Sequence, residues 1–176
     1  MIASPRITLV NEHDRIVGYE EKWKVHYDGL LHRAFSVLLF DSQGRLLLQR
    51  RALEKYHSGG LWTNTCCGHP NEGESIEAAA HRRLGEEMGF DCPFAFRYKF
   101  QYKATFENGL TEHEIDHIFV GTYEGDVVPN PEEVMDYRWV SYSELYADYT
   151  RNADLYTYWF GLILQQNPSG FAELGS

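Results

Sequence analysis

The sequence predicts an α+β fold in which a mixed β-sheet lies between helices. Two observations support this fold class: short apolar runs of strand length occupy the middle of the chain, and segments with helical spacing flank them. The chain has 176 residues, which suits one domain on a prior of about 100–200 residues per domain. We therefore expect a single domain over residues 1–176, with its core at about 30–165.

The strands are predicted from apolar runs bounded by turn residues. Residues 35–40 and 46–49 are apolar, and the turn formers at 41–44 separate them, so we expect a hairpin of buried strands there. The other expected strands are 7–10, 98–106 and 112–120, the last two joined by a turn at 107–109, and a short strand at 137–140.

Three helices are predicted. Over residues 75–88 apolar residues recur at steps of three to four, and Gly89 follows as a stop signal. A short helix is expected at 141–146 and an aromatic-rich one at about 154–166. A Gly-rich, Cys-containing loop is expected at 58–73, just before the first helix.

The charge balance restricts the partners. Sixteen Lys and Arg residues stand against 26 Asp and Glu residues, which gives a formal net charge of −10. Nucleic acid is excluded as a main partner because phosphate-backbone binding needs a basic stripe. A small anionic ligand would need a local cationic pocket or a metal ion that works against the overall field.

The compartment is predicted to be the cytoplasm. No run approaches the roughly 18 apolar residues of a membrane span, so no membrane association is expected, and the N-terminus lacks a signal-peptide core. The three cysteines include the adjacent pair Cys66 and Cys67, which is no disulfide framework and suits a reducing compartment.

The most informative motif spans residues 68–90. Gly68 is followed after five residues by Glu74, and after seven more by the run RRLGEEMGF. This resembles the signature of the Nudix family, a loop–helix–loop that binds a divalent metal and a diphosphate, except that Arg83 stands where the pattern has its first helix glutamate. Arg83 and Glu87 share a helix face, which offers a guanidinium for phosphate and a carboxylate for Mg²⁺. The alternative is a solvated, salt-bridged helix face.

Separated motifs resemble type 1 isopentenyl-diphosphate isomerase, in the order of that family, from about residue 7 to 165. They are LHRAFS at 31–36, RRALEK at 50–55, TNTCCGHP at 63–70, EHE at 112–114 and EEVMDYRW at 132–139. The resemblance implies interconversion of isopentenyl and dimethylallyl diphosphate in isoprenoid biosynthesis. The implied partner is the isoprenoid diphosphate substrate, and we expect a monomer or weak homodimer.

The resemblance also implies a single metal held by three imidazoles and two carboxylates: His26, His32, His69, Glu112 and Glu114. Such ligands suit Mn²⁺, Zn²⁺ or Fe²⁺, and Mn²⁺ is expected first. Glu112 and Glu114 are two residues apart, so on a strand both point to one face. The interval from His26 to His32 is expected to be a loop. The remaining histidines receive no role: His13, His57, His81, His113 and His117.

The implied acid and base are Glu114 and Cys67, on opposite faces of the alkene. We favour Glu114 as the protonating acid and Cys67 as the base, an order that the sequence leaves open. Cys66 is interpreted as a buried small hydrophobe. Tyr102 matches a tyrosine that assists near the carboxylate, and Trp159 matches a tryptophan whose face stabilises the developing cation by about 2 kcal/mol when desolvated. For both aromatics, core packing is the alternative.

The diphosphate is expected to bind cations and a second metal. By family position the cations are Lys22, Arg51, Lys55 and Arg83. Mg²⁺ is expected to bridge through Glu87 and the main-chain carbonyl of Cys67.

Two other functions are compatible with the fold. One is a Nudix pyrophosphohydrolase acting on nucleoside diphosphate derivatives, against which Arg83 and the pair of Cys67 and Glu114 argue, because hydrolysis uses several helix glutamates. The other is a non-catalytic metal-binding or regulatory module of the same fold.

Overall fold

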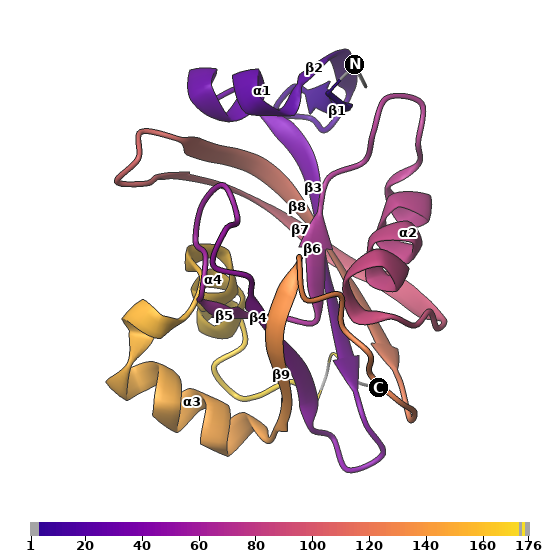
Figure 1. Ribbon diagram of the computed structural model, residues 1–176, viewed down its shortest axis with the longest axis vertical. Helices are drawn as coiled ribbons and strands as arrows, with labels where there is room; N and C mark the ends of the chain where they lie inside the picture. The colour runs from indigo at the N-terminus through magenta and orange to yellow at the C-terminus, as the bar shows by residue number, and fades with distance from the viewer. Residues whose placement is uncertain (1–3, 173, 175–176) are drawn as a thin grey trace.

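The computed structural model describes residues 4–172 and 174, and a nine-stranded mixed sheet runs through its centre (Figure 1). The strands are β1 (Arg6–Val10), β2 (Ile16–Glu21), β3 (His32–Phe40), β4 (Leu46–Arg51), β5 (Trp62–Thr63), β6 (Cys66–Gly68), β7 (Phe94–Thr105), β8 (Thr111–Thr122) and β9 (Val134–Val140). Strand β3 is central: it pairs in parallel with β8 along its whole length and antiparallel with β1, β4 and β6 at separate points. The mixed sheet predicted from the sequence is therefore confirmed.

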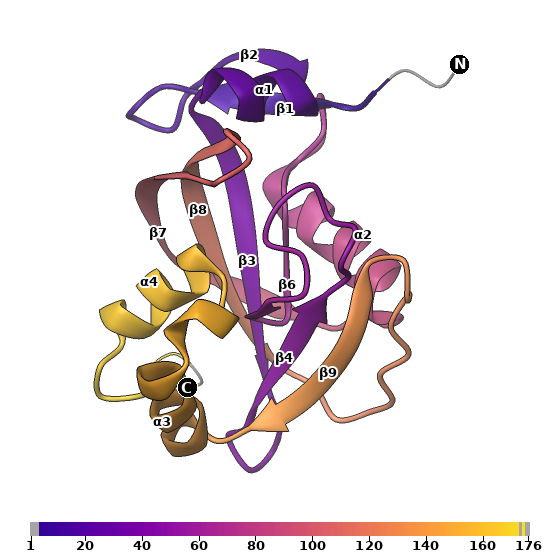
Figure 2. The ribbon, with the colours of Figure 1, turned by 60° about the vertical axis from the view of Figure 1, so that its left-hand side comes forward.

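Helices cover both faces of the sheet. They are α1 (Lys22–Asp28), α2 (Ile76–Met88), α3 (Tyr142–Arg151), the 3₁₀ turn η1 (Ala153–Leu155) and α4 (Tyr158–Gln166). Helix α2 lies on one face and α3 and α4 lie on the other, while α1 and the β1–β2 hairpin sit together at one end (Figures 1 and 2). Among the described residues, no helix combines the length and the apolar character needed to cross a membrane.

Two apolar cores follow from the alternation of side chains along β3. Val37 and Leu39 pack with the cluster beneath α2, whereas Leu38 and Phe40 pack with the cluster beneath α4. Each fully buried side chain of this kind contributes about 1.5–3 kcal/mol relative to an exposed one. The sheet is thus held from both sides, which gives the site a rigid support.

Helix α2 begins and ends where the sequence predicts. Ser75 caps it by accepting a hydrogen bond at its side chain from the amide of Ala78, and Gly89 ends it with a φ of 78°. The predicted helix at 141–146 is also present but continues to Arg151, because the Ser141–Glu144 capping box starts a helix that no breaker stops earlier.

Two predictions about pairing and continuity were only partly right. The expected hairpin of 35–40 and 46–49 pairs in register only at Phe40 and Leu46, because β6 and β8 take the sides of β3 and β9 takes the side of β4. The helix expected at 154–166 is broken: η1 ends at Leu155, the backbone extends at Tyr156, and α4 begins at Tyr158.

Four elements of the site region were not predicted: β2, α1, β5 and β6. The interval from His26 to His32 is not all loop, because His26 lies inside α1. The Gly-rich loop 58–73 contains the short strands β5 and β6, and β2 precedes α1. Helix α1 and strand β2 are rich in polar and charged residues, so neither shows the apolar period that signals a helix or strand.

Asp14, in the turn between β1 and β2, ties this hairpin to the main sheet. Its carboxylate accepts hydrogen bonds from Arg33 Nε on β3 at 2.9 Å and Lys99 Nζ on β7 at 3.0 Å, and lies 2.8 Å from His117 Nε2 on β8. Partial burial opposes the charge, but the hydrogen bonds from Lys99 and Arg33 outweigh it and lower the pKa of Asp14. Because α1 follows this hairpin, the contact also steadies the helix that carries His26.

We expect Asp14→Asn to lower the free energy of unfolding by about 1–3 kcal/mol at pH 7, as charged hydrogen bonds are lost. Since the folded pKa lies below the unfolded value of about 3.9, the stabilisation is present above that pH and is lost as the pH falls through the folded pKa. Urea unfolding at pH 7, 5 and 3.5 should therefore show the gap to wild type narrowing only at the lowest pH. A gap independent of pH would contradict the assignment.

Candidate metal centre and adjoining pocket

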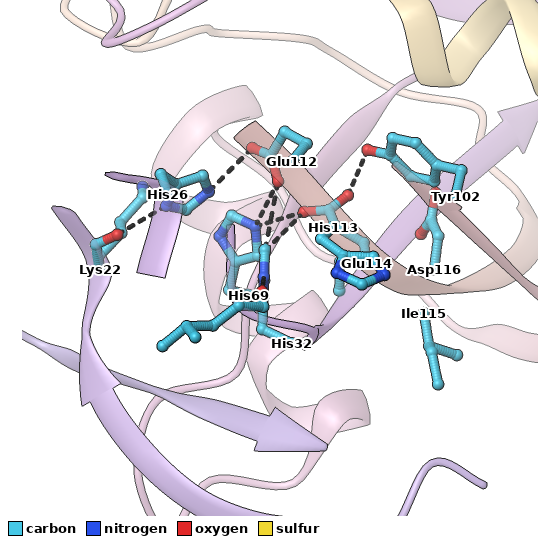
Figure 3. A network of polar contacts seen from close by, with 12 residues as sticks. Lys22, His26, His32, His69, Tyr102, Glu112, His113, Glu114, Ile115 and Asp116 are labelled. Atoms are coloured by element: carbon cyan, nitrogen blue, oxygen red, sulfur yellow. Dashed lines mark hydrogen bonds and ion pairs between the residues drawn. The ribbon is translucent and has the colours of Figure 1, made fainter. Parts of the chain in front are cut away.

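The five residues predicted to hold a metal come together in one cluster. His26 comes from α1, His32 from β3, His69 from the turn after β6, and Glu112 and Glu114 from β8 (Figure 3). One potential ligand atom from each lies within 4.8 Å of the others. The parallel pairing of β3 with β8 places His32 directly opposite Glu114, so the sheet register builds the centre of the cluster.

Backbone carbonyls orient two of the imidazoles. His26 Nδ1 lies 2.6 Å from the carbonyl of Lys22, and His32 Nδ1 lies 2.8 Å from that of Leu30. If these nitrogens carry the ring hydrogens, the opposite Nε2 atoms face the cluster with free lone pairs. This arrangement is typical of metal-binding histidines, whose second nitrogen donates to a carbonyl or carboxylate.

The donor set fits a divalent cation. Within the described part of the chain, the buried Oε2 atom of Glu112 has no hydrogen-bond partner, although His32 Nε2 lies 3.3 Å away. His32 Nε2 and His69 Nε2 lie 3.1 and 2.7 Å from Oε2 of Glu114. Burial opposes a charge on His32, but the carboxylates of Glu112 and Glu114 beside it raise its pKa to about 10. The carboxylates of the cluster thus favour positive charge at this place.

A cavity of about 430 Å³ adjoins the cluster. Its walls include all four of the predicted diphosphate-binding cations, the thiol-bearing Cys67, the ring of Trp159 and the two cluster carboxylates. The predicted residues that line it are Lys22, Arg51, Lys55, Cys67, His69, Arg83, Glu112, Glu114 and Trp159. The net-acidic chain therefore contains the local cationic pocket that an anionic ligand requires.

The cations are held close together. Arg83 Nη2 lies 3.0 Å from Glu133 Oε2, and Lys55 also pairs with Glu133. Lys22 Nζ lies 4.3 Å from the centre of the Tyr56 ring. Burial, with the positive charge of Lys55 next, lowers the pKa of Lys22 to about 8. Such crowding of cations is relieved by a bound anion.

The adjacent cysteines point to opposite faces of the sheet, as residues next to each other on a strand must. Cys66 is buried beneath α2, and its thiol donates to Glu87 Oε1 at 3.3 Å. Cys67 lines the cavity, and burial raises the pKa of its thiol to about 12. Cys67 is thus the one of the pair that a ligand in the cavity can reach.

Tyr102 and Glu87 lie next to residues that line the cavity but do not line it themselves. Tyr102 pairs with Glu114 across β7 and β8, and its hydroxyl donates a hydrogen bond to Glu114 Oε1 (Figure 3). Glu87 is 1% exposed and lies 3.7 Å from Arg83 Nη2 and 3.6 Å from Lys55 Nζ. Neither predicted residue lines the cavity in the described structure, but each contacts side chains that do.

Sequence reasoning missed several residues of the site. Asp116 is buried beside Glu114 and accepts a hydrogen bond from Ser36 Oγ at 2.8 Å. Since Asp116 follows Glu114 by two positions on β8, the alternation that grouped Glu112 with Glu114 was a signal for it as well. Tyr56, His57 and Glu133 carry no comparable signal, because they reach the site from loops.

The fold and the cluster define the class of the protein. The family model of the NUDIX domain matches residues 30–160. DR0079 from Deinococcus radiodurans superposes with a TM-score of 0.69 at 21% identity, covering 83% of this chain and 89% of that one. A MutT protein from Methanosarcina mazei superposes with a TM-score of 0.58 at 23% identity, covering 66% and 81% of the two chains. These structures share the fold, and the chain is a NUDIX-domain protein.

Sequence relatives narrow the class to one family. The chain is 52% identical over 158 residues to "Isopentenyl-diphosphate Delta-isomerase 2" of Photorhabdus laumondii, covering 90% of this chain and 89% of the relative. It is 50% identical over 161 residues to "Isopentenyl-diphosphate Delta-isomerase" of Burkholderia multivorans, covering 92% of each. The chain belongs to the isopentenyl-diphosphate Delta-isomerase family, as the sequence motifs predicted.

The loop between β4 and β5 carries Lys55, Tyr56 and His57, and Gly59 sets its path. A Cβ atom at Gly59 would lie 2.3 Å from the carbonyl oxygen of Leu53. Since the obstacle is backbone, any larger residue there forces the loop to move.

We expect Gly59→Ala to destabilise the fold by about 1–3 kcal/mol through overpacking. The matched control is Gly18→Ala, because nothing lies within 4 Å of a Cβ at Gly18; that change should stay within about 0.5 kcal/mol. Thermal and urea unfolding of both variants measure the difference. Equal stability of the two would show that the loop is free to take another path.

Proposed function

We propose that this protein interconverts isopentenyl diphosphate and dimethylallyl diphosphate. One observation carries the proposal: Cys67 and Glu114 line the same cavity, between a metal-binding cluster and a group of cations, in a chain of the isomerase family. A thiol and a carboxylate supply the two proton-transfer groups that an allylic shift needs. The cations supply the site for the diphosphate.

Two divalent ions fit the donor atoms. The cluster of His26, His32, His69, Glu112 and Glu114 suits Mn²⁺, with Zn²⁺ or Fe²⁺ as alternatives, because it mixes imidazole with carboxylate. Mg²⁺ would be held through Glu87 and the main-chain carbonyl of Cys67, next to Arg83 and Lys55. When bound, the ions supply positive charge that orients the cluster carboxylates and offsets the charge of the diphosphate.

Positively charged side chains bind the diphosphate end of the substrate. Arg51 and Arg83 offer planar forks for phosphate oxygens, and Lys22 and Lys55 act as point charges. Glu133 holds Arg83 and Lys55 in place while no anion is bound. The five-carbon tail then extends toward Cys67, Glu114 and Trp159.

Glu114 and Cys67 move the protons. The Glu114 carboxyl gives its proton to the terminal CH₂ carbon, which leaves positive charge on the tertiary carbon. Cys67, in the thiolate form that the nearby cations Arg51 and Lys55 favour against the effect of burial, then removes a proton from the carbon nearer the diphosphate, and the double bond forms there. The hydrogen bond from Tyr102 supports Glu114 by stabilising the carboxylate that remains after it gives its proton. After these two steps Glu114 is a carboxylate and Cys67 is a thiol. Once the product leaves, Cys67 loses a proton to water and Glu114 takes one up from water, which restores both groups for the next turnover.

Trp159 closes the apolar side of the cavity. It is 4% exposed, so water is excluded from the reacting carbons on this side. Its indole face is suited to stabilise a developing carbocation by about 2 kcal/mol when desolvated. The cation of Arg51 lies 5.3 Å from the same ring and marks the end of the cavity that the charged head of the substrate occupies.

The proposal extends to the setting in which the protein works. The three cysteines are free thiols, which supports the cytoplasm as the compartment. All the residues assigned here lie on one chain, which is compatible with a monomer or weak homodimer.

We expect Cys67→Ala and Glu114→Gln each to abolish turnover, with Cys66→Ala as the matched control that keeps it. The measurement is incubation with isopentenyl diphosphate and both metal ions in D₂O, followed by NMR of the dimethylallyl product. Thermal unfolding should show that all three variants fold. Near-normal incorporation of deuterium by either of the first two variants would remove the assigned mechanism.

Arg83→Glu should raise the Michaelis constant at least tenfold, because loss of a charged contact to phosphate costs about 1.5–3 kcal/mol. Arg15→Glu makes the same charge change at an exposed turn and should leave the constant unaltered. Assays for released phosphate accompany the kinetics. Phosphate release from nucleotide substrates by wild type, with no allylic product, would favour a hydrolase instead.

A further inference from the structure

His57 lies closer to Glu112 than His26 or His32 does, although it is outside the group of five potential ligands. Its Nε2 atom lies 2.5 Å from Glu112 Oε1. Its other ring nitrogen, Nδ1, lies 3.0 Å from the hydroxyl of Ser58, which can donate to it. With that hydroxyl as the donor to Nδ1, the ring hydrogen sits on Nε2 and points at Glu112.

The His57 ring is fixed in this orientation by packing and by its backbone. It stacks on Phe106 with the ring centres 4.4 Å apart and meets the edge of Trp159 at 5.7 Å. Arg51 Nη2 donates to the His57 carbonyl at 3.2 Å. His57 itself is 5% exposed. The ring of His57 is therefore held so that its Nε2–H points at Glu112.

The two oxygens of Glu112 have different surroundings. Oε1 lies 2.9 Å from His26 Nε2, 2.5 Å from His57 Nε2 and 3.3 Å from the hydroxyl of Tyr56. With the His26 ring hydrogen on Nδ1, facing the carbonyl of Lys22, His26 Nε2 has none to give. His57 and Tyr56 are then the donors to Oε1, and His57 is much the closer. Oε2 has no hydrogen-bond partner among the described residues and faces the cluster.

We propose that His57 is a positioning residue for the metal centre: by donating Nε2–H to Glu112 Oε1, it holds the carboxylate so that Oε2 faces the ion. The inference rests on the metal site of the proposed function. Hydrogen bonds of this kind orient the ligands of metal centres, and their removal costs about 10–100-fold in metal affinity. The same loop carries Lys55, and Arg51 donates a hydrogen bond to its backbone. The cations proposed for the diphosphate and the histidine proposed to hold Glu112 therefore belong to one segment of the chain.

The test removes the donor and keeps the ring. His57→Phe preserves stacking on Phe106 but cannot donate, whereas His57→Gln keeps an amide donor. The matched control is His81→Phe: His81 also stacks on a phenylalanine, Phe94, at 3.9 Å and pairs with a carboxylate, Asp91, at 2.6 Å, outside the site. Mn²⁺ is titrated into the full-length, chelator-treated protein, and free Mn²⁺ is followed by electron paramagnetic resonance.

His57→Phe should weaken Mn²⁺ binding about 10–100-fold, His57→Gln should recover most of the affinity, and His81→Phe should match wild type. At saturating Mn²⁺ the Michaelis constant for isopentenyl diphosphate should change little in His57→Phe. Should that variant not fold, His57→Met, which also lacks a donor, replaces it in the comparison with His57→Gln.

Three results would overturn the inference, and each has a different meaning. Unchanged Mn²⁺ affinity in a folded His57→Phe would remove the role of His57 and leave the metal site intact. Loss of one nitrogen from the ion's coordination in spin-echo spectra would make His57 a ligand, not a positioning residue. Absence of Mn²⁺ binding by wild type would overturn the proposed metal site together with this inference.

Discussion

The parallel register between β3 and β8 is the constraint on which the site depends. It sets His32 opposite Glu114, while the antiparallel pairings on either side set Tyr102 opposite Glu114 and Cys67 opposite Ser36. Glu114 and Cys67, the proposed acid and base, therefore stand on one face of the sheet with His32 and Glu112 of the predicted metal cluster. A slip of β8 by a single residue would turn both cluster carboxylates to the other face. The two apolar cores oppose such a slip, because it would bring polar side chains into each of them.

The cavity gathers positive charge although the net charge of the chain is negative. The protein is net acidic, yet one cavity is lined by the two buried carboxylates of Glu112 and Glu114 and by five cations: Lys22, Arg51, Lys55, Arg82 and Arg83. Glu133 lies against Arg83 and Lys55, so these two cations are paired before a ligand arrives and the cost of burying them is reduced. A diphosphate must compete with Glu133 for the same donors. A ligand with several negative charges close together competes with Glu133 better than a single carboxylate does.

Predictions from the sequence succeeded where one local pattern decides the structure. Helix α2 follows from its apolar spacing and its caps. The opposite orientations of Cys66 and Cys67 were not predicted, because they come from β6, a strand inside a segment expected to be a loop. Pairing of β3 could not be foreseen, because three other strands compete for its edges and only the whole fold decides among them. His57 contacts Glu112, 55 positions away in the chain, a relation that no local pattern records.

The loop between β4 and β5 joins two functions that family motifs treat separately. Arg51 and Lys55 face the diphosphate end of the cavity, while His57 contacts the carboxylate of Glu112 at the metal end. Arg51 also donates a hydrogen bond to the carbonyl of His57, so one side chain contacts both the cavity and the residue proposed to support Glu112. The close approach of Gly59 to the backbone of Leu53 leaves this loop little freedom. The proposed phosphate contacts and the proposed support of the metal ligand therefore depend on one constrained segment of the chain.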